Sequence, residues 1–119
     1  MALGGLIQVA RVYAPTAANT TRKTAAATTG STAQNIATAI ASLNTTTNPE
    51  GPVVFVADQD GRLVFGTSSL ATATAAAGIP IAARVPYVFW VHVVRSSYFS
   101  YYNSSATNGG IEYWSGEKA

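Results

Sequence analysis

The stretch from Val85 to Trp114 constrains the fold more than any other part of the chain, because it holds most of the large side chains. Both tryptophans, five of the six tyrosines and two of the four phenylalanines lie in it. From Tyr87 to Val94 both alternating sets of side chains are bulky and mostly apolar, which predicts a central strand covered on both faces. Tyr98 to Asn103 and Ile111 to Trp114 then predict two strands joined as a hairpin by a polar loop.

A further hairpin is predicted near the middle of the chain. The runs from Val53 to Ala57 and from Arg62 to Gly66 are rich in β-forming residues, and they flank a short turn that ends in Asp60-Gly61. Gly61 can adopt the left-handed conformation that such a turn uses. Leu6 to Tyr13 also alternates, but neither of its faces is cleanly apolar, which is typical of an edge strand or of a strand that pairs with another chain.

One helix is predicted, from Ser31 to about Leu43. Ser31 followed by Gln34 makes a capping box, and Asn44 can end the helix. Thr67 to Gly78 is compatible with either a short helix or a loop. The apolar residues of the predicted helix recur at helical spacing and form a narrow stripe suited to packing on a sheet, namely Ala33, Ile36, Ala37, Ile40 and Leu43.

The segment from Ala14 to Gly30 contains no large apolar side chain, so alone it cannot offset the entropy lost on ordering. It is either a flexible linker or an extended arm that orders on a neighbouring subunit. We therefore divide the chain into an N-terminal strand and arm, residues 1–30, and a single β-rich domain, residues 31–119. The expected fold is mainly β (α+β), a compact antiparallel β-sandwich or barrel with one short helix and an extended N-terminal arm.

The low charge content of the chain has two explanations, one of which fits a subunit that packs against other proteins. Hydrophobic residues make up 48% of the chain and charged residues only 10%, whereas roughly 25% charged is usual in soluble domains. Such a surface is either solvated by hydroxyls and amides or buried in interfaces, whose cores are depleted of charge. The net charge is +2 and the basic residues cluster only at Arg22-Lys23, so no specific nucleic-acid partner is expected. No apolar run is long enough to span a membrane, and no cysteine is present.

The motifs of enzyme active sites are missing from the sequence. His92 is the single histidine, and it is expected to be a hydrogen-bonded structural residue in a strand. Asp58 and Asp60 resemble the start of a calcium loop, but Leu63 and Phe65 stand where further oxygen ligands should follow. No carboxylate pair, phosphate loop or zinc spacing is found. We therefore expect no enzyme activity, no cofactor and no metal site.

The tyrosine-rich segment is the best candidate for a partner surface. Tyrosine and tryptophan are enriched in protein interfaces, where they offer rigid area with one polar contact. Core packing together with an interface and core packing alone remain equal alternatives for these side chains. Of the stretch as a whole, Tyr87 to Val94 is assigned to the core and Tyr98 to Trp114 to the partner surface. The predicted interface residues are Arg11, Tyr13, Arg22, Lys23, Tyr98, Tyr101, Tyr102, Tyr113 and Trp114.

The sequence YFSYYNSSATNGGIEYWSG, from Tyr98 to Gly116, resembles the closing hairpin of small bacteriophage virion proteins of the capsid decoration or cement type. The low charge and the Ala/Thr-rich arm are also similar to these proteins, whereas the helix from Ser31 to Leu43 is not implied by the resemblance. The resemblance implies a non-enzymatic structural subunit, made in the host cytoplasm and located in the virion. Its partners would be other virion proteins and itself, as a homo-oligomer or bound to a lattice.

A second resemblance points to a different class of protein. VVFVADQDGRLVFG, from Val53 to Gly66, looks like the first hairpin of roadblock and profilin-like modules. The predicted order of a helix, a hairpin, a possible helix and three strands is similar to theirs. This alternative implies a small cytoplasmic scaffold or regulatory module that binds partners through a helix or a sheet surface.

Overall fold

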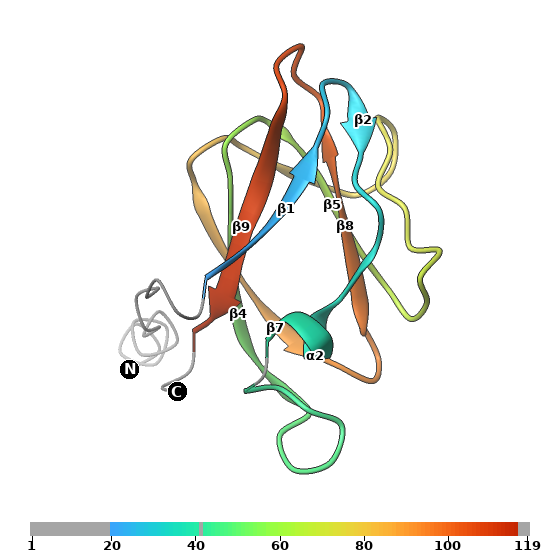
Figure 1. The fold of residues 1–119 in the computed structure, drawn as a ribbon, viewed down its shortest axis with the longest axis vertical. Helices are drawn as coiled ribbons and strands as arrows, with labels where there is room; N and C mark the ends of the chain where they lie inside the picture. The colour runs from blue at the N-terminus through green and yellow to red at the C-terminus, as the bar shows by residue number, and fades with distance from the viewer. Residues whose placement is uncertain (1–19, 41, 117–119) are drawn as a thin grey trace, which may run out of the picture.

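The computed structural model describes residues 20–40 and 42–116. The predicted strand from Leu6 to Tyr13 therefore lies outside the described residues. Strands dominate the described part of the chain, and the one helix there is a single turn (Figure 1). In chain order the elements are β1 (Thr21–Ala25), β2 (Thr29–Gly30), β3 (Gln34–Asn35), α2 (Ile36–Ala39), β4 (Glu50–Ala57), β5 (Gly61–Gly66), β6 (Ile79–Ile81), β7 (Pro86–His92), β8 (Tyr98–Asn103) and β9 (Gly109–Ser115).

The strands form two antiparallel sheets that face each other, as Figure 1 shows. Sheet A has the strand order β1-β9-β4-β7. Sheet B has the order β2-β8-β5-β6, and β3 pairs with the same partner, β8, as β2 does. The mainly β fold is confirmed, and of the two predicted architectures it is the sandwich.

The strands pair in a nested order, so that the chain resembles a long hairpin folded over itself. The first strand pairs with the last (β1 with β9), then β2 and β3 with β8, β4 with β7, and β5 with β6. Each of these pairs lies within one sheet, and successive pairs alternate between sheet A and sheet B. This is the jelly-roll arrangement of a two-sheet β protein.

The core lies between the two sheets and is built around Phe55 of β4. Its ring is edge-on to Phe99 of β8 at 5.2 Å between centroids, and it stacks on Tyr113 of β9 at 5.8 Å. Phe65 and Phe89 complete the cluster from β5 and β7. Edge-to-face packing of this kind joins the two sheets through their largest side chains.

Neither predicted hairpin forms, because in each case the two strands belong to different sheets. β4 lies in sheet A and β5 in sheet B, and likewise β8 lies in sheet B and β9 in sheet A. The strand positions themselves are close to those predicted. A short polar turn fits both a hairpin and a crossing between facing sheets, and the apolar faces of both strands can then bury against each other.

The predicted helix from Ser31 to Leu43 is wrong in extent, since among the described residues of that range only Ile36–Ala39 is helical. The side chain of Asn35, not of Ser31, caps it by accepting a hydrogen bond from the backbone N–H of Thr38 at 3.0 Å. Ser31 is instead tied to β8, because its Oγ accepts the N–H of Tyr101 at 3.0 Å. Pairing with β8 therefore outweighs the local preference for helix over the first part of this segment.

The described part of the predicted arm belongs to the sandwich. β1 pairs along its full length with β9, and β2 pairs with β8. Residues 20–30 are thus ordered by the chain's own strands, which neither the linker nor the arm alternative predicted. Their backbone hydrogen bonds, rather than large apolar side chains, hold them in place.

Gly61 is the first residue of strand β5 and does not adopt the left-handed conformation of a turn. Among the described glycines, Gly78 is the one with a positive φ. It pairs with Asn103 of β8 and with Ile81 of β6. A Cβ atom at this position would overlap the carbonyl oxygen of Tyr102. Glycine is therefore required here by the close approach of β8 to β5.

Candidate interaction surface

The aromatic residues that the sequence assigned to a partner surface are mostly internal. Tyr101 and Tyr113 are 0% and 1% exposed, and both belong to the core. Trp114 is also buried, and Tyr98 and Tyr102 are half-buried. The placement of Tyr101 and Tyr113 at a surface is corrected, because β8 and β9 are interior strands whose inward side chains face the opposite sheet.

The two buried tyrosine hydroxyls differ in their bonding. Tyr101 donates its hydroxyl to the backbone carbonyl of Gln59 at 2.6 Å, whereas the hydroxyl of Tyr113 has no hydrogen-bond partner. Burial, together with the carboxylates of Asp58 and Asp60, raises the pKa of Tyr101 to about 12. Burial alone raises the pKa of Tyr113 to about 12. Both side chains therefore serve packing in their neutral forms.

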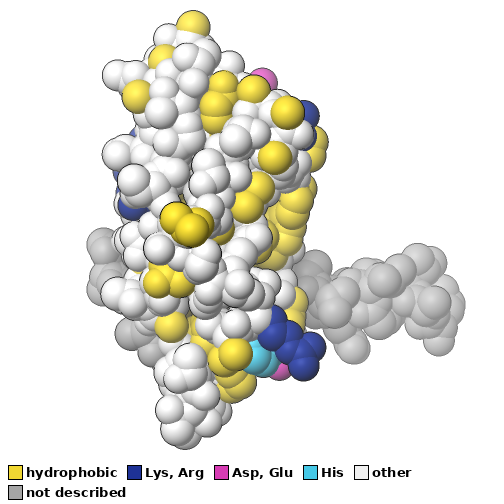
Figure 2. Space-filling view, turned by 90° about the vertical axis from the view of Figure 1, so that its right-hand side faces the viewer, with side chains coloured by type: hydrophobic (Ala, Val, Ile, Leu, Met, Phe, Trp, Pro, Cys, Tyr) yellow, Lys and Arg dark blue, Asp and Glu magenta, His cyan; other side chains and the backbone are white. Residues whose placement is uncertain are grey.

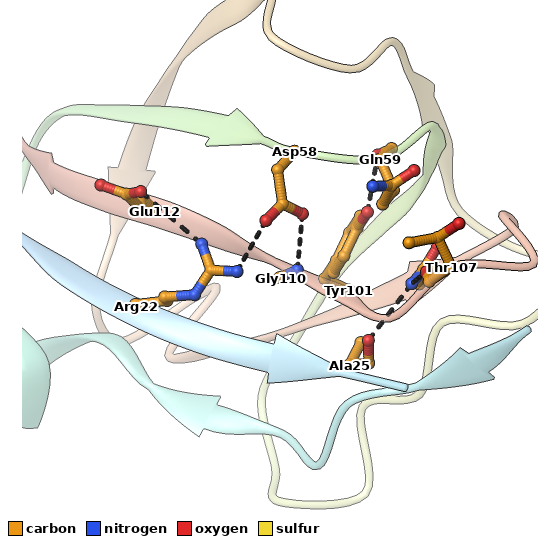
Figure 3. A network of polar contacts seen from close by, with 9 residues as sticks. Arg22, Ala25, Asp58, Gln59, Tyr101, Thr107, Gly110 and Glu112 are labelled. Atoms are coloured by element: carbon orange, nitrogen blue, oxygen red, sulfur yellow. Dashed lines mark hydrogen bonds and ion pairs between the residues drawn. The ribbon is translucent and has the colours of Figure 1, made fainter. Parts of the chain in front are cut away.

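Of the basic residues predicted to bind a partner, Arg22 makes ion pairs within the chain (Figure 3). Its guanidinium bonds Asp58 at 2.6 Å and lies 3.6 Å from Glu112. Asp58 also accepts the backbone N–H of Gly110 at 2.7 Å. Partial burial acts to raise the pKa of Asp58, but the hydrogen bonds from Arg22 and Gly110 outweigh it and lower that pKa. Lys23 is half-buried on the same strand, and Arg11 and Tyr13 lie outside the described residues.

The same network fastens the two sheets at one end of the sandwich, where Figure 3 shows it from close by. Asn103 of β8 is fully buried, and its amide donates to the carbonyl oxygens of Ala25 and Thr107 at 3.2 and 2.8 Å. Asp60 accepts the backbone N–H of Ala83 at 2.7 Å. These polar groups bond to elements of the chain itself, so we assign the cluster a structural role.

The surface that sequence reasoning missed is an apolar band on the outer face of sheet A, which runs from Trp114 of β9 across β4 to β7. Side chains that point away from the core lie side by side across the strands, as the register gives them. Trp114, Val54 and Val88 form one row, and Pro52 and Trp90 form the next. Val54 and Trp114 are buried yet lie outside the core between the sheets. Over this band sheet A is therefore apolar on both faces, which is unusual for an antiparallel sheet of a sandwich.

The part of this outer face that is open to solvent lies over β7 and its flanks. Trp90 is 67% exposed and Val88 is 47% exposed. Val85 and Val94, just before and after the strand, are exposed as well. In Figure 2 hydrophobic side chains form a band down the right-hand edge of the molecule. We call the exposed set Val85, Pro86, Val88 and Trp90 the β7 patch.

One end of the β7 patch is closed by polar groups. Trp90 donates its indole N–H to Glu50 at 2.9 Å, and the other carboxylate oxygen of Glu50 lies 3.7 Å from Nε2 of His92. Nδ1 of His92 accepts the backbone N–H groups of Val94 and Arg95 at 3.2 and 3.4 Å. His92 is thus a hydrogen-bonded structural residue, as predicted. The hydrogen bond to Glu50 also fixes the orientation of the Trp90 indole.

The prediction that Tyr87 to Val94 is a central strand is wrong for the single chain. β7 is at the end of sheet A, and its outward side chains are exposed. The inward residues Phe89 and Val91 do face the core, so the assignment holds for one face only. The sequence signal for the β7 patch was the alternation itself, in which both faces are apolar.

The described residues offer little to a metal or a small ligand. In the described ranges no three His, Asp or Glu side chains gather closely enough to hold a metal ion. A small hollow beside the β7 patch has no titratable group in its lining, which consists of Phe65, Phe89, Trp90, Val91 and Ser96. Within residues 20–40 and 42–116, no helix has the length and apolarity needed to cross a membrane.

Comparison of the chain with protein-family models, with curated proteins and with solved structures finds no match. The geometry described above therefore carries the functional argument alone. Its main element is an apolar outer sheet face that is partly buried and partly open at β7.

Proposed function

We propose that this chain is a non-enzymatic structural subunit that packs against other subunits of an assembly. The further proposal is that the assembly is a virus particle, in which the chain acts as a capsid decoration, cement or minor virion protein. The observation that carries the proposal is the β7 patch. An exposed tryptophan beside exposed valines on one sheet face is the kind of apolar patch that marks a protein interaction site.

Composition supports an assembly role as well. With only 10% charged residues, the chain has few groups that would oppose burial of its surface. Arg22 is paired with Asp58 and Glu112 at the far edge of sheet A, away from β7. Next to the β7 patch itself, Glu50 is bonded to the indole of Trp90 and lies near His92, so its carboxylate already has partners within the chain.

The fold agrees with a virion subunit by analogy. Jelly rolls form viral capsid proteins, and they also form lectins and cupins. Cupin chemistry uses a metal held by the strands, and the described residues hold no cluster of metal ligands. Lectins bind sugars through polar groups near aromatic rings, and in the β7 patch such groups lie at one end only, where Glu50 bonds Trp90, while the rest is valine and proline. The apolar surface therefore favours a protein partner.

The alternative of a cytoplasmic scaffold of roadblock or profilin-like architecture has less support. The segment from Val53 to Gly66, which carried that resemblance, does not form a hairpin. The helix expected before it is reduced to Ile36–Ala39, which is too short to offer a binding surface.

Location in particles tests the proposed function directly. The chain should co-sediment with purified virus particles in a density gradient and be found in them by mass spectrometry. Trp90→Ser should lower its incorporation at least about tenfold, because removing a buried aromatic anchor from an interface costs about 2 kcal/mol or more. Leu70→Ser is the matched control, since Leu70 is 84% exposed in a loop far from β7 in the chain. A chain that stays in the soluble fraction and is absent from particles would refute the proposal.

A further inference from the structure

The free edge of β7 differs from the other sheet edges of the described residues. Natural β proteins block edge strands with charges, prolines or very short strands, so that they do not pair with other chains. β1, at the opposite edge of sheet A, carries Arg22 and Lys23. In sheet B the edge strand β6 is three residues long with Pro80 at its centre, and β2 has two residues. β7 is seven residues long, and its one proline is its first residue.

The backbone groups of β7 that face the free edge follow from its pairing with β4. Val93 donates its N–H to the carbonyl of Pro49 at 2.7 Å. This pair continues the register of β4 and β7 by one residue beyond Glu50 and His92. Residues two apart in a strand point their backbone groups to the same side. The odd-numbered residues Phe89 and Val91 therefore bond to β4, and the even-numbered Val88 and Trp90 present N–H and C=O at the free edge.

We propose that two copies of this chain pair through β7, antiparallel and about a twofold axis at Phe89, and so join two A sheets into one. This inference rests on the proposed function and names one partner of the assembly subunit, a second copy. In this register Val88 faces the partner's Trp90, and Trp90 faces the partner's Val88. Each pair exchanges both of its backbone hydrogen bonds, because these residues have free N–H and C=O groups.

The other registers use the edge less well. A shift of one residue pair toward the start of the strand places Pro86 opposite the partner's Trp90, and proline has no N–H to donate. A shift the other way places the two Trp90 residues opposite each other and leaves Val88 facing the partner's His92. His92 already uses its carbonyl to accept the N–H of Ser96 at 2.7 Å. In the register centred on Phe89, Pro86 lies opposite the partner's His92, so both losses fall on one residue pair and the Val88–Trp90 pairs keep all of their hydrogen bonds.

The apolar side chains of the two copies are complementary in this arrangement. Directly opposite residues of an antiparallel pair lie on the same face, so each exposed Val88 packs on the indole of the opposite Trp90. Arg84, exposed just before β7, comes to the end of the strand where the partner's Glu50 lies. Arg95 is exposed at that same end, so Arg84 meets one acidic and one basic side chain of the partner there.

Sedimentation equilibrium of the full chain and its variants tests this dimer. The wild-type chain should sediment at twice its mass of 12.3 kDa at micromolar concentration. Val88→Lys should raise the dimer dissociation constant by at least about 100-fold, because an unpaired charge is buried at the shared edge. Leu70→Lys, the matched control, should leave it unchanged. Val88→Pro should also disrupt the dimer while the circular dichroism spectrum is retained, since the Val88 N–H is not bonded to β4.

Hydrogen exchange of single amides reports the pairing itself. The amides of Val88 and Trp90 should exchange fast in dilute monomer and more slowly as concentration rises. The amide of Phe89, which is bonded to β4, should be protected at both concentrations and is the internal control. Because the chain lacks cysteine, mixing Val88→Cys with Trp90→Cys should also give a mixed disulfide faster than either variant alone gives its own.

Several results would overturn the dimer. A wild-type chain that remains monomeric, or a dimer that survives Val88→Lys, excludes pairing through β7. Protection of Val88 and Trp90 in dilute monomer means that a segment of the same chain covers the edge. A faster disulfide between two copies of one variant means that the register is different. None of these results bears on incorporation into particles, so a failed dimer and a failed proposed function are distinguishable.

Discussion

The two buried tyrosines allow a matched test of how the core is held together. Tyr101 and Tyr113 are both almost fully buried and both point between the sheets, but only Tyr101 has a partner for its hydroxyl. Replacing each by phenylalanine removes the same atom from the same kind of site. The two variants should nevertheless change stability in opposite directions.

The magnitudes follow from the cost of unpaired polar groups. A buried hydroxyl without a partner costs about 1–3 kcal/mol, so Tyr113→Phe should raise the free energy of unfolding by about 1 kcal/mol or more. A buried hydrogen bond contributes about 1 kcal/mol, so Tyr101→Phe should lower the free energy of unfolding by about 1–2 kcal/mol. For a chain of this length, about 1 kcal/mol corresponds to roughly 3–5 °C in Tm.

Urea unfolding, followed by tryptophan fluorescence and circular dichroism, measures both changes. All variants should be compared at one protein concentration, because association would add to the apparent stability. Equal m values would show that the same surface is exposed on unfolding in each variant. If Tyr113→Phe destabilises the chain as much as Tyr101→Phe does, the reasoning from the missing partner is refuted.

Three further perturbations test the sandwich. Because the pKa values of Tyr101 and Tyr113 are raised to about 12 in the folded chain, stability should be full below pH 10 and fall as pH rises from about 10 to 12, in alkaline urea titrations. Because the pKa of Asp58 is lowered, its ionised form stabilises the folded chain above about pH 4, and this stabilisation is lost in more acidic solution. Arg22→Ala should therefore lower the free energy of unfolding by less than about 1 kcal/mol at pH 7 and by almost nothing near pH 2. Gly61→Ala should destabilise by about 3 kcal/mol or prevent folding, because its Cβ would meet backbone. Gly66→Ala, which meets a loop side chain instead, should cost less in the same thermal melts.

The positions of the longer strands could be predicted from the sequence, but their partners could not. β4, β5, β8 and β9 all fall on runs with clear alternation and large side chains. A polar turn between two such runs has the same residues whether the chain returns in one sheet or crosses to the facing sheet. The nesting of distant strands depends on contacts between residues far apart in the sequence, which local patterns do not encode.

β1 and the short helix were missed for a different physical reason. β1 has the sequence TRKTA, which buries little apolar surface, and it is held by pairing with β9 and by the bonds of Arg22 to Asp58. The stripe from Ala33 to Leu43 predicted a long helix, yet β8 offers its edge to Gln34 and Asn35, and extended pairing outweighs an alanine-rich propensity there. In both cases tertiary contacts decide the local structure.

The misassignment of β7 carries information about the assembly. A strand that is apolar on both faces is expected in the middle of a sheet, and in the single chain β7 is at the edge with Trp90 exposed. If two copies pair through β7, the strand becomes central in the joined sheet, with a neighbour on each side. The outward row formed by Val54 and Val88 then continues onto the partner's Trp90. The sequence of β7 would thus fit its place in the dimer better than its place in the monomer, and the exchange rates of the Val88 and Trp90 amides decide between the two.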